Sequence, residues 1–355
     1  MSLSPADGSL RVAIAGYGLA GRVFHAALVG ATDGLEVAAV VTNDPDKRAA
    51  LADEHPDARA VDRLDDALVD ADLVVIASPN RFHAELAAQA IDAGRHVVVD
   101  KPLAVTAAQA RKLDARATER GVVLAAFHNR RWDDDFLTLR REVAAGRLGD
   151  VLTLVSRFDR WRPEPKANAW RENADPADGG GLLLDLGSHL VDQAIQLLGP
   201  VSHVYAELDT TRPKAQVEDE VFLSLTHATG ARSHLHAGVH AADGPPRFRA
   251  LGTEGAYVVS GLDPQESQLR AGMRPDDPAF GHRAPGDAAT FHDGSGTSER
   301  LAMERGDWPA FYAGVRDAIR EGAPPPVPAA DAIAVLDVLE AARASARGGT
   351  VVALG

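Results

Sequence analysis

A short run near the N-terminus decides the fold: Leu10-Arg11-Val12-Ala13-Ile14-Ala15-Gly16-Tyr17-Gly18-Leu19-Ala20-Gly21. An apolar strand leads into a Gly-x-Gly-x-x-Gly turn, and a helix-compatible stretch follows. In such a turn the first glycine permits the bend, the second lets a pyrophosphate approach the backbone, and the third lets helix and strand pack closely. A glycine-rich loop can also merely turn. Its place after a first strand nevertheless predicts a dinucleotide site formed by Gly16, Gly18, Leu19, Ala20 and Gly21.

Outward from this turn, residues 10–126 alternate short apolar runs with Ala-rich helical stretches. The runs predicted as strands are Leu10–Ala15, Val37–Thr42, Leu73–Ala77, His96–Val99 and Val122–Ala126. The clearest helical patterns are Arg81–Ala93 and Ala107–Arg120, each followed by a glycine suited to a helix C-terminus. Continuous apolar strands are typical of a parallel sheet covered on both faces. Residues 1–127 are therefore predicted to form a doubly wound α/β Rossmann domain that binds NAD(P).

After residue 127 the pattern changes from alternation to runs of strands. A helix is expected at 134–145, a strand at Val151–Asp159, and a long apolar helix at Leu182–Leu198. Successive strands are then expected at Ser202–Leu208, Glu220–Thr226, Ala231–Val239, Phe248–Leu251 and Ala256–Val259. A surface loop is expected over 272–298, then helices at Trp308–Glu321 and Ala329–Arg347 and a strand at Thr350–Leu354. Residues 128–355 are thus predicted to form an α+β domain with a large, mainly antiparallel sheet for substrate binding and oligomerisation.

Composition excludes several classes of function. The chain has 355 residues, a formal charge of −14 and no cysteine. The negative charge disfavours nucleic acid and anionic membranes as partners. The lack of cysteine excludes disulfides, thiolate catalysis and Cys-ligated metals. No apolar run approaches the ~20 residues that span a bilayer, and the N-terminus lacks the pattern of a secretory signal, so a cytoplasmic location is expected.

The end of the second strand should select the dinucleotide. An acidic residue there binds the ribose hydroxyls of NAD. If Asn43 holds that position, nothing repels a 2′-phosphate, and Lys47 and Arg48 favour NADP; if Asp44 holds it, NAD is favoured. Both residues are cofactor candidates, and the pattern favours NADP slightly.

Two more segments follow carboxyl ends of predicted parallel strands, where ligands of open α/β sheets bind. The cofactor candidates that they contribute are Ser78, Pro79, Asn80, His83, Asp100 and Lys101. A single lysine in such a place is usually just solvated. A functional role for Lys101 is therefore expected only together with the residues described next.

The predicted helix after Gly179-Gly180-Gly181 carries Asp185, His189 and Asp192. Their spacing of four and three residues places all three on one helix face. Such spacing is often a surface ion-pair stripe, but the rest of this helix is Leu, Val, Ile and Ala, which indicates burial. A carboxylate and an imidazole in an apolar helix favour a functional site, for which a cleft between two domains would provide the place.

In order along the chain, these motifs resemble the glucose–fructose oxidoreductase, inositol dehydrogenase and MocA (Gfo/Idh/MocA) family. Three further stretches resemble its NADP-dependent scyllo-inositol dehydrogenases: His128-Asn129-Arg130-Arg131-Trp132, Ala169-Trp170-Arg171-Glu172 and Gly187-Ser188-His189-Leu190-Val191-Asp192-Gln193. The family usually has Glu-Lys-Pro where this chain has Asp100-Lys101-Pro102. The charge at position 100 is kept, so only the local geometry is in doubt.

The resemblance implies roles for individual residues. His189 would be the general base, because its ordinary pKa of about 6.5 suits proton transfer near neutrality. Lys101 would stabilise negative charge on the reacting oxygen. Asp185 would bind substrate hydroxyls, with Asn129, Arg131 and Trp170 as further substrate contacts, while Asp192 would support His189. The resemblance also implies a homodimer or homotetramer.

Four histidines on neighbouring predicted strands raise the question of a metal: His227, His234, His236 and His240. A metal site needs three or four converging ligands, and no convergent carboxylate is apparent near these histidines. A solvated or subunit-facing side of the sheet is the favoured interpretation, and no metal is expected.

The sequence therefore predicts an NAD(P)-dependent dehydrogenase acting on CH–OH groups of a polyol, inositol or sugar-like substrate. Two alternatives remain open. One is a non-catalytic, dinucleotide-bound regulator, because fold does not fix function. The other is an imine or enone reductase on the same scaffold.

Overall fold

The computed structural model describes residues 8–165, 170–173, 175 and 178–355, without the side chains of Trp170 and Asn173. The chain forms two compact units. Unit 1 comprises Met1–Asn129, Gln265–Phe280 and Asp307–Ile333, and unit 2 comprises Arg130–Pro264, Gly281–Gly306 and Ala334–Gly355. The domain boundary that the sequence predicts between residues 127 and 128 stays a prediction. By compactness, two later segments join the N-terminal residues.

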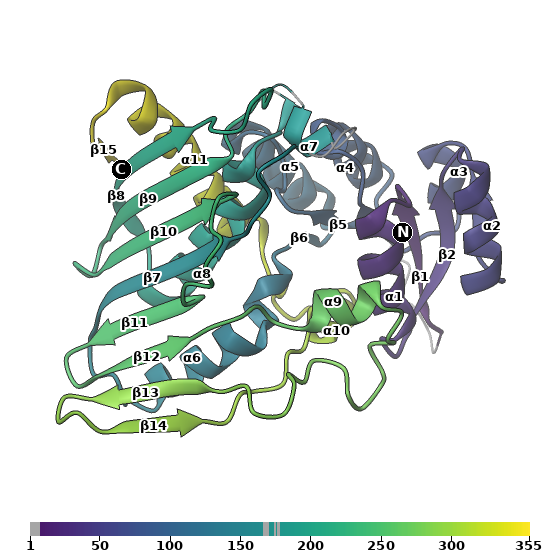
Figure 1. Ribbon diagram of the computed structural model, residues 1–355. Helices are drawn as coiled ribbons and strands as arrows, with labels where there is room; N and C mark the ends of the chain where they lie inside the picture. The colour runs from purple at the N-terminus through teal and green to yellow at the C-terminus, as the bar shows by residue number, and fades with distance from the viewer. Residues whose placement is uncertain (1–7, 166–169, 174, 176–177) are drawn as a thin grey trace. The chain divides into compact units, whose positions relative to one another are not determined.

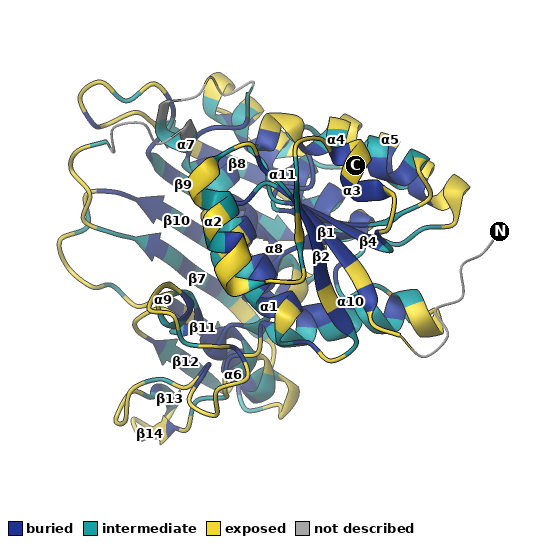
Figure 2. Cartoon of the chain, turned by 90° about the vertical axis from the view of Figure 1, so that its right-hand side faces the viewer, coloured by how far each residue is buried: buried dark blue, intermediate teal, exposed yellow. Residues whose placement is uncertain are grey.

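Unit 1 is built on a six-stranded sheet in the order β3-β2-β1-β4-β5-β6, with every neighbouring pair parallel (Figure 1). The strands are β1 (Leu10–Ala15), β2 (Leu35–Val41), β3 (Arg59–Val61), β4 (Leu73–Ile76), β5 (His96–Asp100) and β6 (Leu124–Phe127). All residues of β4 are buried, as expected where helices cover both faces of a sheet (Figure 2). The Rossmann prediction is confirmed.

Helices of unit 1 connect and cover these strands. From the N-terminal part they are η1 (Leu19–Ala26), α1 (Ala27–Gly30), α2 (Pro45–Glu54), α3 (Leu64–Leu68), η2 (Asn80–Phe82), α4 (His83–Asp92) and α5 (Ala107–Arg120). Later segments add α9 (Gln265–Arg270), α10 (Pro309–Glu321) and the start of α11 (Ala329–Gly348). An aromatic cluster attaches α10 to the sheet, because Phe311 and Tyr312 pack on Phe127 of β6.

Unit 2 contains a nine-stranded sheet in the order β14-β13-β12-β11-β7-β10-β9-β8-β15. Its strands are β7 (Val151–Asp159), β8 (Val201–Asp209), β9 (Glu220–His227), β10 (Arg232–Gly238), β11 (Phe248–Gly252), β12 (Gly255–Val259), β13 (Ala289–Asp293), β14 (Ser298–Leu301) and β15 (Val352–Ala353). Only the β7–β10 pair is parallel among these described strands, so the mainly antiparallel α+β prediction is confirmed.

The helices of unit 2 pack on one face of that sheet (Figure 1). They are η3 (Asn129–Trp132, whose first residue belongs to unit 1), α6 (Asp134–Ala144), α7 (Trp170–Asn173), η5 (Leu183–Gly187), α8 (Ser188–Leu198) and most of α11. The strand β9 alternates half-buried and buried residues, as a sheet with one covered face should.

Three sequence expectations need correction. Residues 272–298 are not one long loop, because the hairpin of β13 and β14 begins within them. The helix at 182–198 is not uniformly α-helical, because η5 is a π-helical turn. The elements α2, β3 and α3 were not predicted, since they are short or polar and give weak periodicity.

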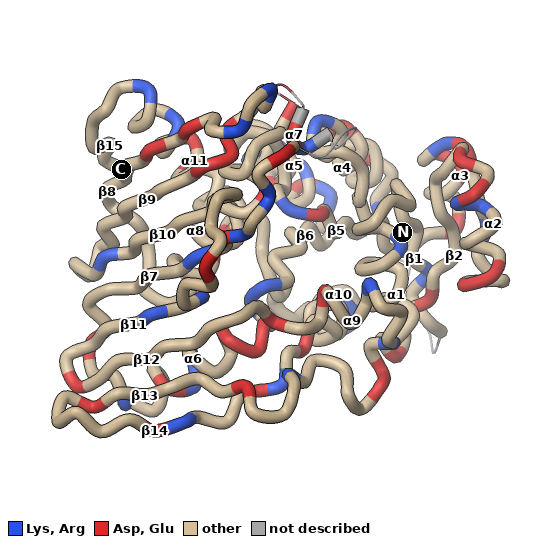
Figure 3. The backbone as a smooth tube through the Cα atoms, in the orientation of Figure 1, with Lys and Arg blue, Asp and Glu red and all other residues tan. Residues whose placement is uncertain are grey.

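Charged residues of both signs are spread along the described chain. Figure 3 shows Lys and Arg interspersed with Asp and Glu along the described elements, in keeping with the net charge of −14. Among the described residues, no helix is both long and apolar enough to cross a membrane.

Candidate active site

The turn after β1 has the geometry of a phosphate-binding loop. Gly16 has φ +103°, and a Cβ there would lie 2.7 Å from the carbonyl oxygen of Ala77. A Cβ on Gly21 would lie 2.0 Å from the carbonyl oxygen of Gly16, so the third glycine is required for packing. Gly18 is exposed, and its Cβ would meet nothing within 4 Å. The open space around Gly18 lies at the N-terminus of η1, where Leu19 is exposed and Ala20 is half-buried. This space therefore fits a pyrophosphate.

At the end of β2, Asn43 and Asp44 differ in what their side chains do. Asp44 is the N-cap of α2, where its carboxylate accepts hydrogen bonds from the backbone N–H groups of Asp46 and Lys47. It also forms an ion pair of 3.2 Å with the Lys47 ammonium. Hydrogen bonding from Lys47 is the main cause that lowers the pKa of Asp44. Asn43, by contrast, has an exposed side chain.

His83 connects the ends of two neighbouring parallel strands. Its Nδ1 lies 2.8 Å from the carbonyl oxygen of Pro102, and its Nε2 lies 2.9 Å from that of Ser78. The ring is fully buried. These contacts hold the turn after β4, where Ser78 and Pro79 are half-buried and Asn80 is buried, to the turn after β5. The ring therefore contacts the two turns of the candidate site through their backbone carbonyl groups.

Lys101 lies in the turn after β5 and is half-buried. Its backbone N–H donates a 2.8 Å hydrogen bond to Oδ1 of the buried Asp100. Behind this turn, His25 of η1 is fully buried, and its Nδ1 lies 2.6 Å from the Tyr312 hydroxyl. Burial lowers the pKa of His25 to about 4, so that ring is neutral at pH 7. The sequence analysis missed the His25–Tyr312 pair, which joins residues 287 positions apart.

In unit 2, η5 carries Asp185 and continues directly into α8, which carries His189 and Asp192. His189 is buried, and its ring meets the Phe158 ring of β7 at a centroid distance of 6.4 Å. Asp185 is half-buried, and its Oδ1 lies 3.4 Å from Nε of Arg171 in α7. The neighbouring candidate Trp170 lies in α7, but its side chain is outside the described part.

Asp192 and Arg131 form a buried ion pair with each other. Nε and Nη2 of Arg131 donate to the Asp192 carboxylate at 2.6–3.2 Å. The next residue, Gln193, donates a 2.7 Å hydrogen bond to the carbonyl oxygen of Arg130. Asp192 therefore holds η3 against α8, and Arg131 contacts this carboxylate. Asn129, at the start of η3, is buried.

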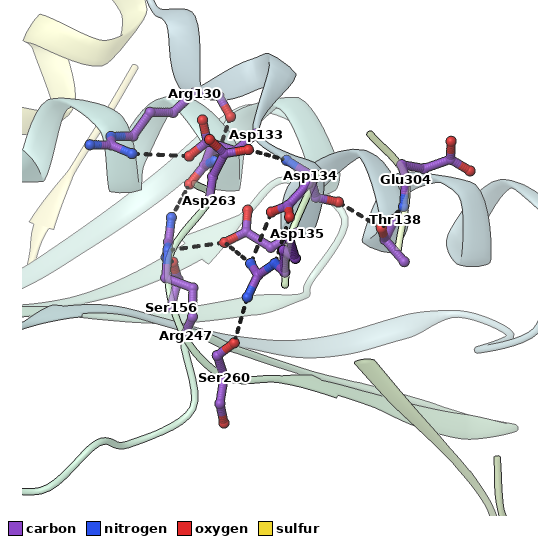
Figure 4. Close-up of polar contacts among 12 residues, drawn as sticks. Arg130, Asp133, Asp134, Asp135, Thr138, Ser156, Arg247, Ser260, Asp263 and Glu304 are labelled. Carbon is purple, nitrogen blue, oxygen red and sulfur yellow. Dashed lines mark hydrogen bonds and ion pairs between the residues drawn. The ribbon is translucent and has the colours of Figure 1, made fainter. Parts of the chain in front are cut away.

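A buried network of acids and arginines supports this arrangement (Figure 4). Its charged members are Arg130, Asp133, Asp134, Asp135, Arg247, Asp263 and Arg283. Arg247 stacks on the ring of Phe158, with its guanidinium carbon 3.9 Å from the centroid, and donates a 2.6 Å hydrogen bond to Gln193. Nothing in the sequence pattern indicated this network, because its members come from distant segments.

The carboxyl groups of this network are affected by burial. Burial raises the pKa of Asp134 to about 6, against the opposing effect of Arg283, and raises that of Asp263 well above its ordinary value. The network includes Arg130 of η3 and contacts Gln193 of α8 through Arg247, and it therefore supports the segment that packs on α8.

The strand histidines have different surroundings. His227 is buried between the carbonyl oxygen of Gly199 and the Ser233 hydroxyl. His236 lies between Asp159 and Glu220, at 2.5 and 2.7 Å, and the sequence analysis did not identify these two carboxylate partners. The partner strands place these carboxylates there, and Asp159 is the main cause of the raised pKa of His236. Within the described residues, no group of three or more His, Asp or Glu side chains is arranged to hold a metal.

Family comparison covers most of both halves of the sequence. Residues 10–128 match the model of an oxidoreductase family with an NAD-binding Rossmann fold, and residues 136–258 match that of the GFO/IDH/MocA C-terminal domain. The first match contains the phosphate-binding turn and Lys101. The second contains Asp185, His189 and Asp192.

Individual relatives match over nearly their whole length. The oxidoreductase YdgJ of Escherichia coli is 41% identical, covering 96% of this chain and 97% of its own. The scyllo-inositol 2-dehydrogenase (NADP(+)) IolW of Bacillus subtilis is 34% identical over 96% and 94%. The solved structure of the oxidoreductase yvaA from Bacillus subtilis has a TM-score of 0.93 at 33% identity, over 98% and 99% of the two chains. The chain therefore belongs to the Gfo/Idh/MocA oxidoreductase family and is an NAD(P)-binding oxidoreductase.

Proposed function

We propose that this protein interconverts a secondary alcohol and a ketone on a polyol, inositol or sugar-like substrate. The observation that carries the proposal is the helix start that presents Asp185 and His189 four residues apart, one half-buried and the other buried. Such a pair can bind a hydroxyl group and move its proton. IolW acts on such a substrate by name, and so does the levoglucosan dehydrogenase of Pseudarthrobacter phenanthrenivorans, which is 29% identical over 54% of this chain and 56% of its own.

In this mechanism His189 accepts the proton of the substrate hydroxyl during oxidation and returns it during reduction. Lys101 donates a hydrogen bond to the same substrate oxygen and stabilises its developing negative charge. Asp185 accepts hydrogen bonds from neighbouring hydroxyl groups and thereby orients the substrate. A bound nicotinamide would supply the hydride chemistry at the reacting carbon.

The residues that would hold the dinucleotide fit it. The open space at Gly18 and the N-terminus of η1 suit the pyrophosphate. The turns that follow β4 and β5 lie on neighbouring strands at the same edge of the sheet, where His83 holds them together. Ser78, Pro79, Asn80 and Asp100 would therefore line or support the nicotinamide side.

We further propose a preference for NADP. The Asp44 carboxylate is engaged at the start of α2, whereas the exposed Asn43 leaves no negative charge to repel a 2′-phosphate. Asn43→Asp should reduce the affinity for NADP relative to that for NAD at least about tenfold, because the new carboxylate would repel the 2′-phosphate of NADP. Asp44→Ala is the control: it removes a helix cap and should leave that ratio nearly unchanged. A wild-type preference for NAD would contradict the proposal.

The catalytic assignment is tested by Lys101→Ala and His189→Ala. Each should lower turnover about 100-fold or more, as expected when acid–base catalysis is lost, while the dinucleotide still binds. Turnover and nicotinamide binding are measured on the same preparations. Near-normal turnover in both variants would remove these residues from the reaction.

The substrate class is tested with a panel of inositols, sugars, simple ketones, imines and enones, with NAD and NADP in parallel. Oxidation of substrates with neighbouring hydroxyl groups supports the proposal. Turnover confined to imines or enones would favour the reductase alternative, and no turnover with any compound would favour a regulator.

We also propose that the protein assembles as a homodimer or homotetramer through the sheet face of unit 2 opposite its helices. Half-buried side chains of β7, β9 and β10 on that face include Val155, Phe222 and His234. Light scattering should give a mass of two or four chains, and Val155→Glu should reduce it. A monomer at micromolar concentration would contradict the assembly.

A further inference from the structure

Glu218 lies just before β9, outside every motif that the sequence analysis singled out. Its side chain is only 10% exposed. Burial raises its pKa, while Arg343 and backbone N–H groups act in the opposite direction. A buried carboxylate is costly unless charged or hydrogen-bonded partners compensate for the lost water. The groups that contact the Glu218 side chain therefore indicate its role.

Those partners are at the start of the helix that carries Asp185 and His189. The carbonyl oxygen of Glu218 accepts a 3.0 Å hydrogen bond from the N–H of Leu182. The backbone N–H of Leu183 also acts on the carboxylate of the same residue and lowers its pKa. One residue thus interacts with two consecutive N–H groups of a helix whose own N-cap, Leu182, offers no side-chain acceptor.

Two neighbours fix the carboxylate in this position. Nη2 of Arg343 in α11 lies 3.2 Å from Oε1 of Glu218. Gly181 also lies against the carboxylate, because a Cβ there would be 2.3–2.6 Å from the carboxyl atoms. Gly181 also has φ +93°, a conformation that favours glycine. The glycine before the helix is therefore explained by the carboxylate that it accommodates.

The backbone around Glu218 is anchored as well. The next residue, Asp219, accepts hydrogen bonds from the backbone N–H and hydroxyl of Thr211 at 2.7 and 2.8 Å, and from Nε of Arg212 at 2.8 Å. Arg212 in turn pairs with Glu172 of α7 at 3.1 Å. The segment that presents Glu218 is therefore held independently of the helix that it caps.

We propose that Glu218, fixed by Arg343, is a positioning residue that sets the start of η5 and thereby the placement of Asp185 and His189. The proposal rests on the proposed function for its catalytic consequence. Its structural part concerns unit 2 alone. A negative charge at a helix N-terminus also interacts favourably with the helix dipole, which strengthens the attachment.

The test compares Glu218→Ala and Glu218→Gln with Glu299→Ala as a matched control. Glu299 also pairs with an arginine, Arg147, but lies on the edge strand β14, five positions from β10 in the sheet order. Hydrogen–deuterium exchange of the amides at 182–186 is measured in the full-length protein, with kcat, KM and dinucleotide affinity. Glu218→Gln keeps a carbonyl oxygen that can accept from Leu183.

Glu218→Ala should speed exchange at 182–186 about tenfold and lower kcat at least about tenfold, with dinucleotide affinity within about twofold of wild type. Glu218→Gln should recover most of both effects, and Glu299→Ala should show neither. If Glu218→Ala does not fold, the same comparison is made between Glu218→Gln and Arg343→Gln, which should each give a smaller loss in the same direction.

Exchange at 182–186 unchanged from the Glu299→Ala control would overturn the capping role. Faster exchange with unchanged kcat would overturn the positioning role. A wild-type protein without activity on any substrate would instead count against the proposed function, since the exchange measurement does not depend on turnover.

Discussion

Two helices of this molecule have similar backbone starts, but one N-terminus is open and the other is covered by a side chain. Both η1 in unit 1 and η5 in unit 2 follow glycines, are π-helical in their first turns and have no side-chain cap of their own. The N-terminus of η1 is open beside Gly18, whereas that of η5 is closed by Glu218, whose side chain is mostly covered. An open helix start can bind a phosphate, and a closed one can hold side chains in place. Similar backbone patterns therefore serve binding in one unit and positioning in the other.

The closed helix start can be broken most severely at Gly181. Gly181→Ala should destabilise the protein by about 2 kcal/mol, because an alanine is strained at positive φ and its Cβ would collide with the Glu218 carboxylate. Denaturant unfolding measures the loss. In a double-mutant cycle, Glu218→Ala should relieve about 1 kcal/mol of it by removing the collision. Strictly additive losses would show that the two residues do not interact.

The same substitution at the open helix start should have a different effect. Gly18 has φ −82°, which alanine adopts readily, and its Cβ would meet no protein atom within 4 Å. Gly18→Ala should therefore leave the free energy of unfolding within about 0.5 kcal/mol of wild type. It should weaken dinucleotide binding about tenfold, because the pyrophosphate approaches the backbone there. Fluorescence titration measures the affinity, and unchanged binding would place the pyrophosphate elsewhere.

The contrast also shows how far sequence reasoning reached. The fold of unit 1 followed from continuous apolar strands and one glycine-rich turn, which are local signals. Asp185 and His189 could be proposed as site residues because both lie on a single apolar helix. The substrate role of Arg131 stays a prediction, and the sequence did not indicate the ion pair of its guanidinium with Asp192, 61 positions away.

Glu218 and the His25–Tyr312 pair were missed for the same physical reason. Their partners lie far along the chain, and no periodicity connects them. A glycine at 181 was visible in the sequence, but the group that excludes a side chain there was not. Long-range polar contacts of this kind need the folded arrangement of the chain, whereas apolar periodicity does not.

The smallest expected effect is a pH dependence of stability that belongs to the closed helix start. Because burial raises the pKa of Glu218 above its ordinary 4.5, the folded protein binds this proton more readily than the unfolded chain. Its contribution to stability is therefore fully present below 4.5 and is lost as the pH rises through the folded-state pKa. Glu218→Gln lacks this proton. The free energy of unfolding of wild type minus that of the variant should consequently increase on acidification towards pH 4.5 and then level off. Urea unfolding of both proteins over this pH range measures the difference. The contributions of the other carboxylates are common to both proteins and cancel in it. A difference that decreased on acidification would mean that Arg343 and the helix N–H groups outweigh burial, so that the carboxylate is held at the helix start more strongly than its surroundings indicate.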